Sequence, residues 1–133
     1  MRRVHNERTG SAAVELALVL PLALMMALAL LQVGLLAKDS LVLVQAAREG
    51  AREAAVTEDN ERVRQAALRG GGGLAGERTE VDVERTGGMG DPVTVHVRYR
   101  SPLVVPFVEW LFPDEVLLQS AATMRQETAE PVA

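Results

Sequence analysis

The sequence predicts an α+β protein. A long N-terminal helix crosses a membrane and continues as a stem, and a small antiparallel sheet of about three strands packs on its upper half. Leu16–Ala37 contains no charged residue. At about 1.5 Å per residue this run is roughly 33 Å long, enough to cross a hydrocarbon core of ~30 Å. From Arg78 onward, apolar and polar residues alternate with the period of half-buried strands.

The composition limits what can accompany this helix. The chain has 133 residues, so the part after Ala37 has room for one small domain outside the membrane. A net charge of −4 gives no electrostatic reason to expect nucleic-acid binding. The chain has no cysteine, which excludes disulfides, thiolate metal sites and a cysteine nucleophile.

A basic leader, residues 1–10, precedes the apolar run and sets its orientation. Arg2, Arg3 and Arg8 lie before the helix, whereas only Lys38 and Asp39, which cancel, follow it. The positive-inside rule therefore predicts a single-pass protein of the cytoplasmic (inner) membrane with its N-terminus in the cytoplasm and its C-terminal domain outside. The run is too long for the apolar part of a secretory signal peptide, so an uncleaved signal anchor is the stronger simple alternative.

Glu15 needs an explanation, because a carboxylate at the end of a membrane helix is costly unless it lies at the interface or is paired. A capping box does not explain it, since Ser11 as N-cap needs an acid at the position of Val14. An acid favoured by the helix dipole is the simple interpretation. Alternatively, cleavage between Gly10 and Ser11 creates an α-amine that pairs with Glu15 within one helix or between neighbouring helices.

The residues around Gly10 resemble the processing site of type IV pilins and pseudopilins, in which a glycine precedes the cut and an acid is the fifth residue of the mature chain. Gly10 is followed by SAAVE, which ends at Glu15. The wider run GSAAVELALVLPLAL, together with AAREGAREAA at 46–55, is similar to TadE-like minor pseudopilins of tight-adherence (Flp-type) pili. The resemblance covers about the first 55 residues, and the remaining part is similar only in its general strand-rich pattern.

This resemblance implies a function. A prepilin peptidase cuts between Gly10 and Ser11, and the protein then helps to initiate or cap a pilus, with Glu15 as the residue on which assembly depends. The implied partners are the peptidase, other pilin or pseudopilin subunits, the pilus assembly platform and the membrane. After assembly the protein would be part of an extracellular pilus.

Three other functions remain open from the sequence. One is a signal-anchored binding module that is never cleaved, and another is a membrane-anchored enzyme. The third is a pseudopilin of a secretion or DNA-uptake system, although the AAREGAREAA stretch favours the tight-adherence type.

Two residues interrupt the apolar run. Pro21 removes one backbone hydrogen bond and is expected to bend the helix unless neighbouring groups compensate, and helices of the resembled family carry a proline near this place. Gln32 could hydrogen-bond across helices in assembly. The favoured expectation is that it lies near the outer interface and contributes little.

The helix is expected to span residues 11–56, since 40–55 contains no proline and only one glycine. Small residues recur there at helical spacing and form a stripe along which another element can approach closely. The partner is either the protein's own sheet, which we favour, or neighbouring helices in a filament. The stripe comprises Ala47, Gly50, Ala51 and Ala54.

Residues 57–133 are expected to form the outer domain. An acidic break with an N-cap at Thr57 or Asp59 begins a short helix at about 58–69. The four glycines at 70–73 end this helix as a turn, because they lack the Gly-Lys-Ser/Thr ending of a phosphate-binding loop.

Three strands are expected after this turn. The first contains Val81 and Val83, and a hairpin loop at 86–91 leads to a second, half-buried strand. The acidic outer face of the first strand can meet Arg98 and Arg100 across the hairpin. The inward residues of the second strand are Val93, Val95, Val97 and Tyr99, and those of the third, at 116–125, are Val116, Leu118, Ala122 and Met124.

Two segments flank this third strand. The aromatic residues at 107–112 either form a helical turn that covers the sheet, which we favour, or touch the membrane interface. The tail at 126–133 is expected to be loose.

No set of residues predicts catalysis. His5 lies in the leader and His96 on a polar strand face, and neither has a second ligand at metal-binding spacing. The serines lack the G-x-S-x-G context of a hydrolase. We therefore expect no enzyme activity, no cofactor, no metal and no small-molecule substrate.

Overall fold

The computed structural model describes residues 7–104 and 115–127. The expected helical turn at 107–112 falls outside this range, as do Arg2, Arg3, His5 and most of the tail. The described elements are α1 (Glu7–Val56), α2 (Asn60–Gly70), a short 3₁₀ turn η1 (Gly76–Arg78), β1 (Thr79–Arg85), β2 (Pro92–Pro102) and β3 (Glu115–Arg125). The predicted α+β class, with a long N-terminal helix and a three-stranded antiparallel sheet, is confirmed.

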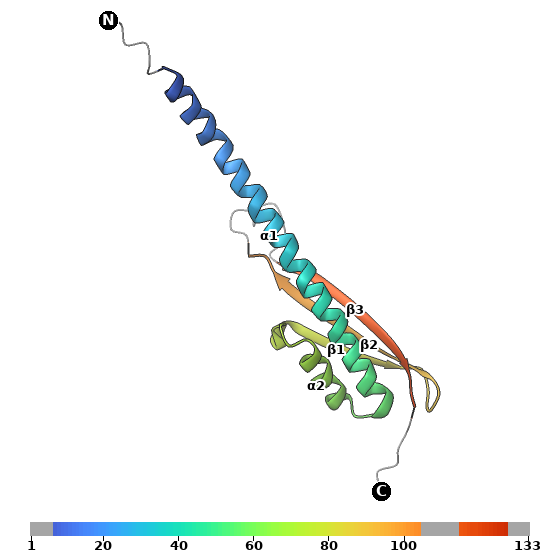
Figure 1. Ribbon diagram of the computed structural model, residues 1–133. Helices are drawn as coiled ribbons and strands as arrows, with labels where there is room; N and C mark the ends of the chain where they lie inside the picture. Colours follow the sequence, from blue (N-terminus) through green and yellow to red (C-terminus); the bar gives the residue numbers. More distant parts are fainter. Residues whose placement is uncertain (1–6, 105–114, 128–133) are drawn as a thin grey trace, which may run out of the picture.

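α1 is one helix of 50 residues with two different environments. Its N-terminal half projects away from the rest of the chain, and its C-terminal half lies along the sheet and α2 (Figure 1). The helix begins at Glu7, four residues before the expected start, and ends at Val56 as expected. Pro21 lies inside it and the helix continues on both sides, although Pro21 has no N–H to donate to the carbonyl of Ala17.

By length and composition α1 could cross a membrane, and none of its most apolar window is buried within the chain. Large apolar side chains are exposed all around this half of the helix, including Val14, Leu18, Leu24 and Leu30. A helix that is apolar on every face needs an apolar surrounding, such as lipid or other helices.

Residues at both ends of α2 explain where the helix begins and how closely it packs on α1. Of the two expected caps, Asp59 is the N-cap, and its Oδ1 accepts hydrogen bonds from the backbone nitrogens of Glu61 (2.9 Å) and Arg62 (3.4 Å). At the other end, Gly70 lets the helix approach α1 closely. A Cβ at Gly70 would lie 2.8 Å from the Cβ of Glu49 and 3.2 Å from the carbonyl oxygen of Gln45. Gly70 therefore ends α2 where the two helix backbones nearly touch.

The sheet has the order β1-β2-β3, with both pairs antiparallel. Every second residue of β2, from Val93 to Ser101, is buried, which confirms the predicted apolar face. On the outer face Glu80 lies opposite Arg98 in the register, but its carboxylate binds Arg100 at 2.9 Å. Of the two arginines expected to pair with the first strand, Arg100 forms an ion pair with it among the described residues.

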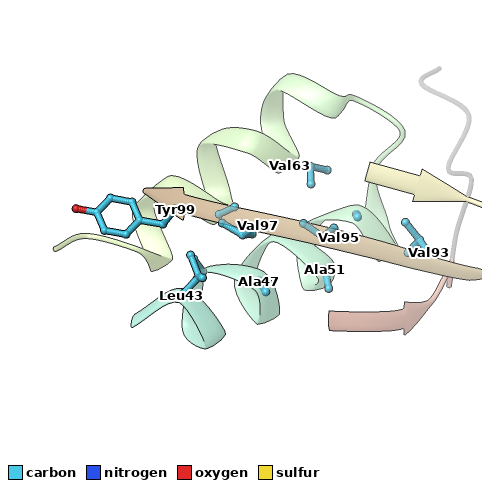
Figure 2. Packing of buried hydrophobic residues seen from close by; sticks show 11 residues of the cluster. Leu43, Ala47, Ala51, Val63, Val93, Val95, Val97 and Tyr99 are labelled. Carbon is cyan, nitrogen blue, oxygen red and sulfur yellow. The ribbon is translucent and has the colours of Figure 1, made fainter. Parts of the chain in front are cut away.

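The core lies between the sheet and the two helices. Figure 2 shows the valines of β2 together with Leu43, Ala47 and Ala51 of α1 and Val63 of α2. β3 is an edge strand and its inward residues are only partly covered: Val116, Leu118 and Ala122 are half-buried. Met124, which we expected on the inward face, is 38% exposed near the end of that strand.

Candidate functional site

The expected processing site lies in the first turns of α1. Gly10 and Ser11 are both helical and exposed. A Cβ at Gly10 would meet no atom within 4 Å, so nothing in the fold requires a glycine there. Glycine costs a helix about 1 kcal/mol relative to alanine, and Gly34 is equally unconstrained, so packing within the chain explains neither glycine.

Glu15 lies one turn after Ser11, on the same face of α1. The hydroxyl of Ser11 donates a hydrogen bond to Oε1 of Glu15 at 3.4 Å, and both side chains are exposed. In the uncut chain the nitrogen of Ser11 belongs to a peptide bond. The amine–carboxylate pair therefore stays a prediction about the cleaved chain. The geometry brings the two residues together, as that pairing requires.

Gln32 corrects an expectation. It was expected to contribute little, yet it is only 7% exposed, and its Oε1 accepts a hydrogen bond from the backbone nitrogen of Val104 at 2.9 Å. The side chain thereby fastens the chain just after β2 to the apolar half of α1. Sequence reasoning missed this contact because Val104 is far along the chain and no periodic pattern links the two residues.

A second contact of the same kind lies two turns further along α1. The hydroxyl of Ser101 donates a hydrogen bond to Oδ2 of Asp39 at 2.8 Å, and Ser101 is 2% exposed. In the sequence, Asp39 stands out only as a charge that cancels Lys38. The available signal was the register of β2, in which Ser101 continues the inward series of Val97 and Tyr99.

The small-residue stripe of α1 is occupied by the protein itself. Ala47, Ala51 and Ala54 are fully buried, and Gly50 is buried with them. A Cβ at Gly50 would lie 3.0 Å from both the Cβ of Ala67 and a methyl group of Val95. The stripe therefore packs on the protein's own sheet, the favoured alternative, and also on α2, which had not been anticipated as a partner.

The polar face of the sheet holds the described histidine. His96 lies beside Glu84, with 3.4 Å between Nε2 and Oε2. Next to it is an open depression of about 440 Å³, lined by His96, Arg98, Gln119 and Ala121 among others. Among residues 7–104 and 115–127, no three His, Asp or Glu side chains are grouped as metal ligands.

Comparison with known proteins finds a similarity that is confined to the N-terminal helix. Residues 10–52 match the family model described as TadE-like protein. The match begins at Gly10 and ends inside α1, so it covers the apolar half and most of the stem but neither α2 nor the sheet. No curated protein and no solved structure matches this chain. The resemblance inferred from the sequence is confirmed over this helix.

Proposed function

We propose that this chain, a TadE-like protein over residues 10–52, is a minor pilin or pseudopilin of a tight-adherence pilus, with a structural rather than an enzymatic role. A prepilin peptidase cuts it between Gly10 and Ser11, and the exposed part of α1 then packs with other subunits at the initiating or capping end of the filament. One observation carries this proposal: the family match begins at a glycine that the fold itself does not require.

The exposed half of α1 supplies the driving force for such an assembly. In the precursor this half lies in lipid, with the N-terminus in the cytoplasm and the sheet outside. A filament in water must keep the same side chains away from solvent, so they must be buried between neighbouring helices. Glu15 then needs a positive partner, and the new α-amine of Ser11, of the same or a neighbouring subunit, provides it.

The intact mass of the membrane-extracted protein tests the cleavage. With a co-expressed prepilin peptidase we expect the loss of residues 1–10, and we expect Gly10→Leu to abolish it. Gly34→Leu is the matched control, because Gly34 also lies in α1 with no atom within 4 Å of an added Cβ. A chain that keeps its full mass with the peptidase present would refute the proposal.

The role of Glu15 has its own test. We expect Glu15→Ala to be cleaved like the wild type but to be absent from sheared pili, because the α-amine of Ser11 loses its partner. Val14→Ala, a neighbouring exposed change that keeps the carboxylate, is the control. Incorporation of Glu15→Ala at the wild-type level would show that Glu15 is only a first-turn acid.

One observation favours the signal-anchored binding module instead. The bond between Gly10 and Ser11 lies inside a helix, whereas proteases prefer exposed, irregular segments, so cleavage requires the first turns of α1 to unwind. If the mass experiment finds an uncut chain, this alternative takes precedence. If the chain is cut, finding it in a secretion or DNA-uptake filament would identify that other class of pseudopilin.

A further inference from the structure

The end of β2 meets α1 within the apolar half of the helix. The backbone nitrogen of Val104 binds Gln32, which precedes the end of the uncharged run at Ala37. Figure 1 shows this end of the sheet beside the middle of α1, while the β1–β2 loop lies at the opposite end of the domain. The outer domain therefore does not stand clear of the membrane helix but overlaps it.

The length of helix between Glu15 and Gln32 sets the depth of this contact. At about 1.5 Å per residue the two positions are separated by roughly 26 Å along the axis, less than the ~30 Å of a hydrocarbon core. Both cannot lie outside the core of a bilayer of that thickness, and any tilt of α1 shortens the projected distance further. A carboxylate is costly inside the hydrocarbon core, whereas the amide oxygen of Gln32 is already hydrogen-bonded within the protein. We therefore place Glu15 at the cytoplasmic interface and Gln32 in the outer leaflet.

We propose that the domain rests on the bilayer through a membrane-contacting tip, Leu103–Val104, which dips into the outer interface beside Gln32. The tip is chemically suited to lipid: the Val104 side chain is 61% exposed and Leu103 is half-buried. A backbone N–H at that depth must have a partner inside the protein, and Gln32 provides one. The same bond satisfies the amide oxygen of Gln32, whereas its Nε2 is buried with no hydrogen-bond partner among the described residues.

This proposal requires a membrane-inserted α1 but no cleavage. It holds equally for the precursor of a pilin and for a signal-anchored module. A failed cleavage experiment therefore leaves it standing, and a failed depth measurement leaves the pilin proposal standing.

Depth-dependent fluorescence quenching tests the proposal, and the absence of cysteine makes single labels clean. The full chain carrying Val104→Cys with a bimane label is placed in phosphatidylcholine vesicles with acyl chains brominated near the headgroup. Val19→Cys, in the apolar half of α1, is the positive control. Met89→Cys, exposed in the β1–β2 loop, is the negative control.

We expect the label at Val104 to lose fluorescence, as the label at Val19 does, while the label at Met89 keeps it. If Val104 behaves like Met89, the tip stands in water and the proposal is overturned. The measurement is repeated at rising protein-to-lipid ratios. A label that is quenched at low protein density and shielded only at high density would still support the contact of the single chain with the bilayer, with another copy displacing the lipid when the protein is crowded.

A second variant tests whether Gln32 sets the depth. We expect Gln32→Ala to reduce quenching at the Val104 label, because the tip loses its attachment to the helix. Leu31→Ala is the matched control at the same depth, since Leu31 is exposed on α1. Unchanged quenching in Gln32→Ala would overturn the assignment of Gln32 as the attachment point.

Discussion

Gly50 is a position at which α1 closely approaches both α2 and the sheet, so substitutions there probe the packing of the outer domain. A Cβ would lie 3.0 Å from Ala67 on α2 and 3.0 Å from Val95 on β2. Ala67 can move only with its backbone, and Val95 is fully buried. Any added side chain must therefore push α2 or β2 away from α1.

The expected effect is the difference between two terms. Gly50→Ala gains about 1 kcal/mol of helix propensity, whereas forcing a methyl group into a packed core costs about 1–3 kcal/mol. We expect Gly50→Ala to lower the free energy of unfolding by about 0–2 kcal/mol. Gly50→Leu gains a similar propensity but adds more atoms in the same space, so its loss should reach about 3 kcal/mol.

Amide hydrogen exchange of β2, measured on the full chain in detergent micelles, reports this free energy, because a buried central strand exchanges through opening of the domain. Gly76→Ala is the control. A Cβ there would meet nothing within 4 Å, and we expect a change within about 0.5 kcal/mol. If the amides of β2 exchange as slowly in Gly50→Leu as in the wild type, the close approach of α2 and β2 to α1 does not explain why this residue is glycine.

Three smaller predictions concern polar contacts, read by the same exchange measurement. Ser101→Ala should lower the free energy of unfolding by about 1–3 kcal/mol, because half-buried Asp39 loses its donor; equal protection would contradict this. Asp59→Ala should cost about 1 kcal/mol and speed exchange in α2 first, through loss of the N-cap. Glu80→Gln should change stability by less than about 1 kcal/mol, because Glu80 and Arg100 are 59% and 57% exposed; a larger loss would mean that the pair sets strand register.

The parts of this fold that could be predicted are those indicated by patterns of neighbouring residues in the sequence. The uncharged run marks the apolar half of α1, and the alternation from Val93 to Tyr99 marks the inward face of β2. Asp59 was one of two candidate caps, and only the structure shows which residue bonds to the start of α2. Such signals depend on neighbours within a few residues, so the sequence carries them directly.

The parts that could not be predicted depend on contacts between distant segments. Nothing near Gln32 or Asp39 in the sequence indicates a partner, because the partners lie on or just after β2. The small-residue stripe predicted a close neighbour without identifying it, because alanine and glycine accept a helix and a sheet equally well. The structure shows that both the sheet and α2 pack on the stripe.

The division of α1 between two surroundings constrains how the proposed subunit could enter a filament. The stripe at Ala47–Ala54 resembles a surface for neighbouring helices, but the protein's own sheet and α2 already cover it. Opening it would expose the core valines of β2, which costs more than a new helix contact could return at the same place. In the proposed filament, neighbouring helices would pack on the exposed apolar side chains of α1, most of which lie before Gln32. Under the proposed function, Glu15 and not the stripe would lie within the assembling surface. We therefore expect stripe variants to fail by unfolding and Glu15 variants to lose assembly alone.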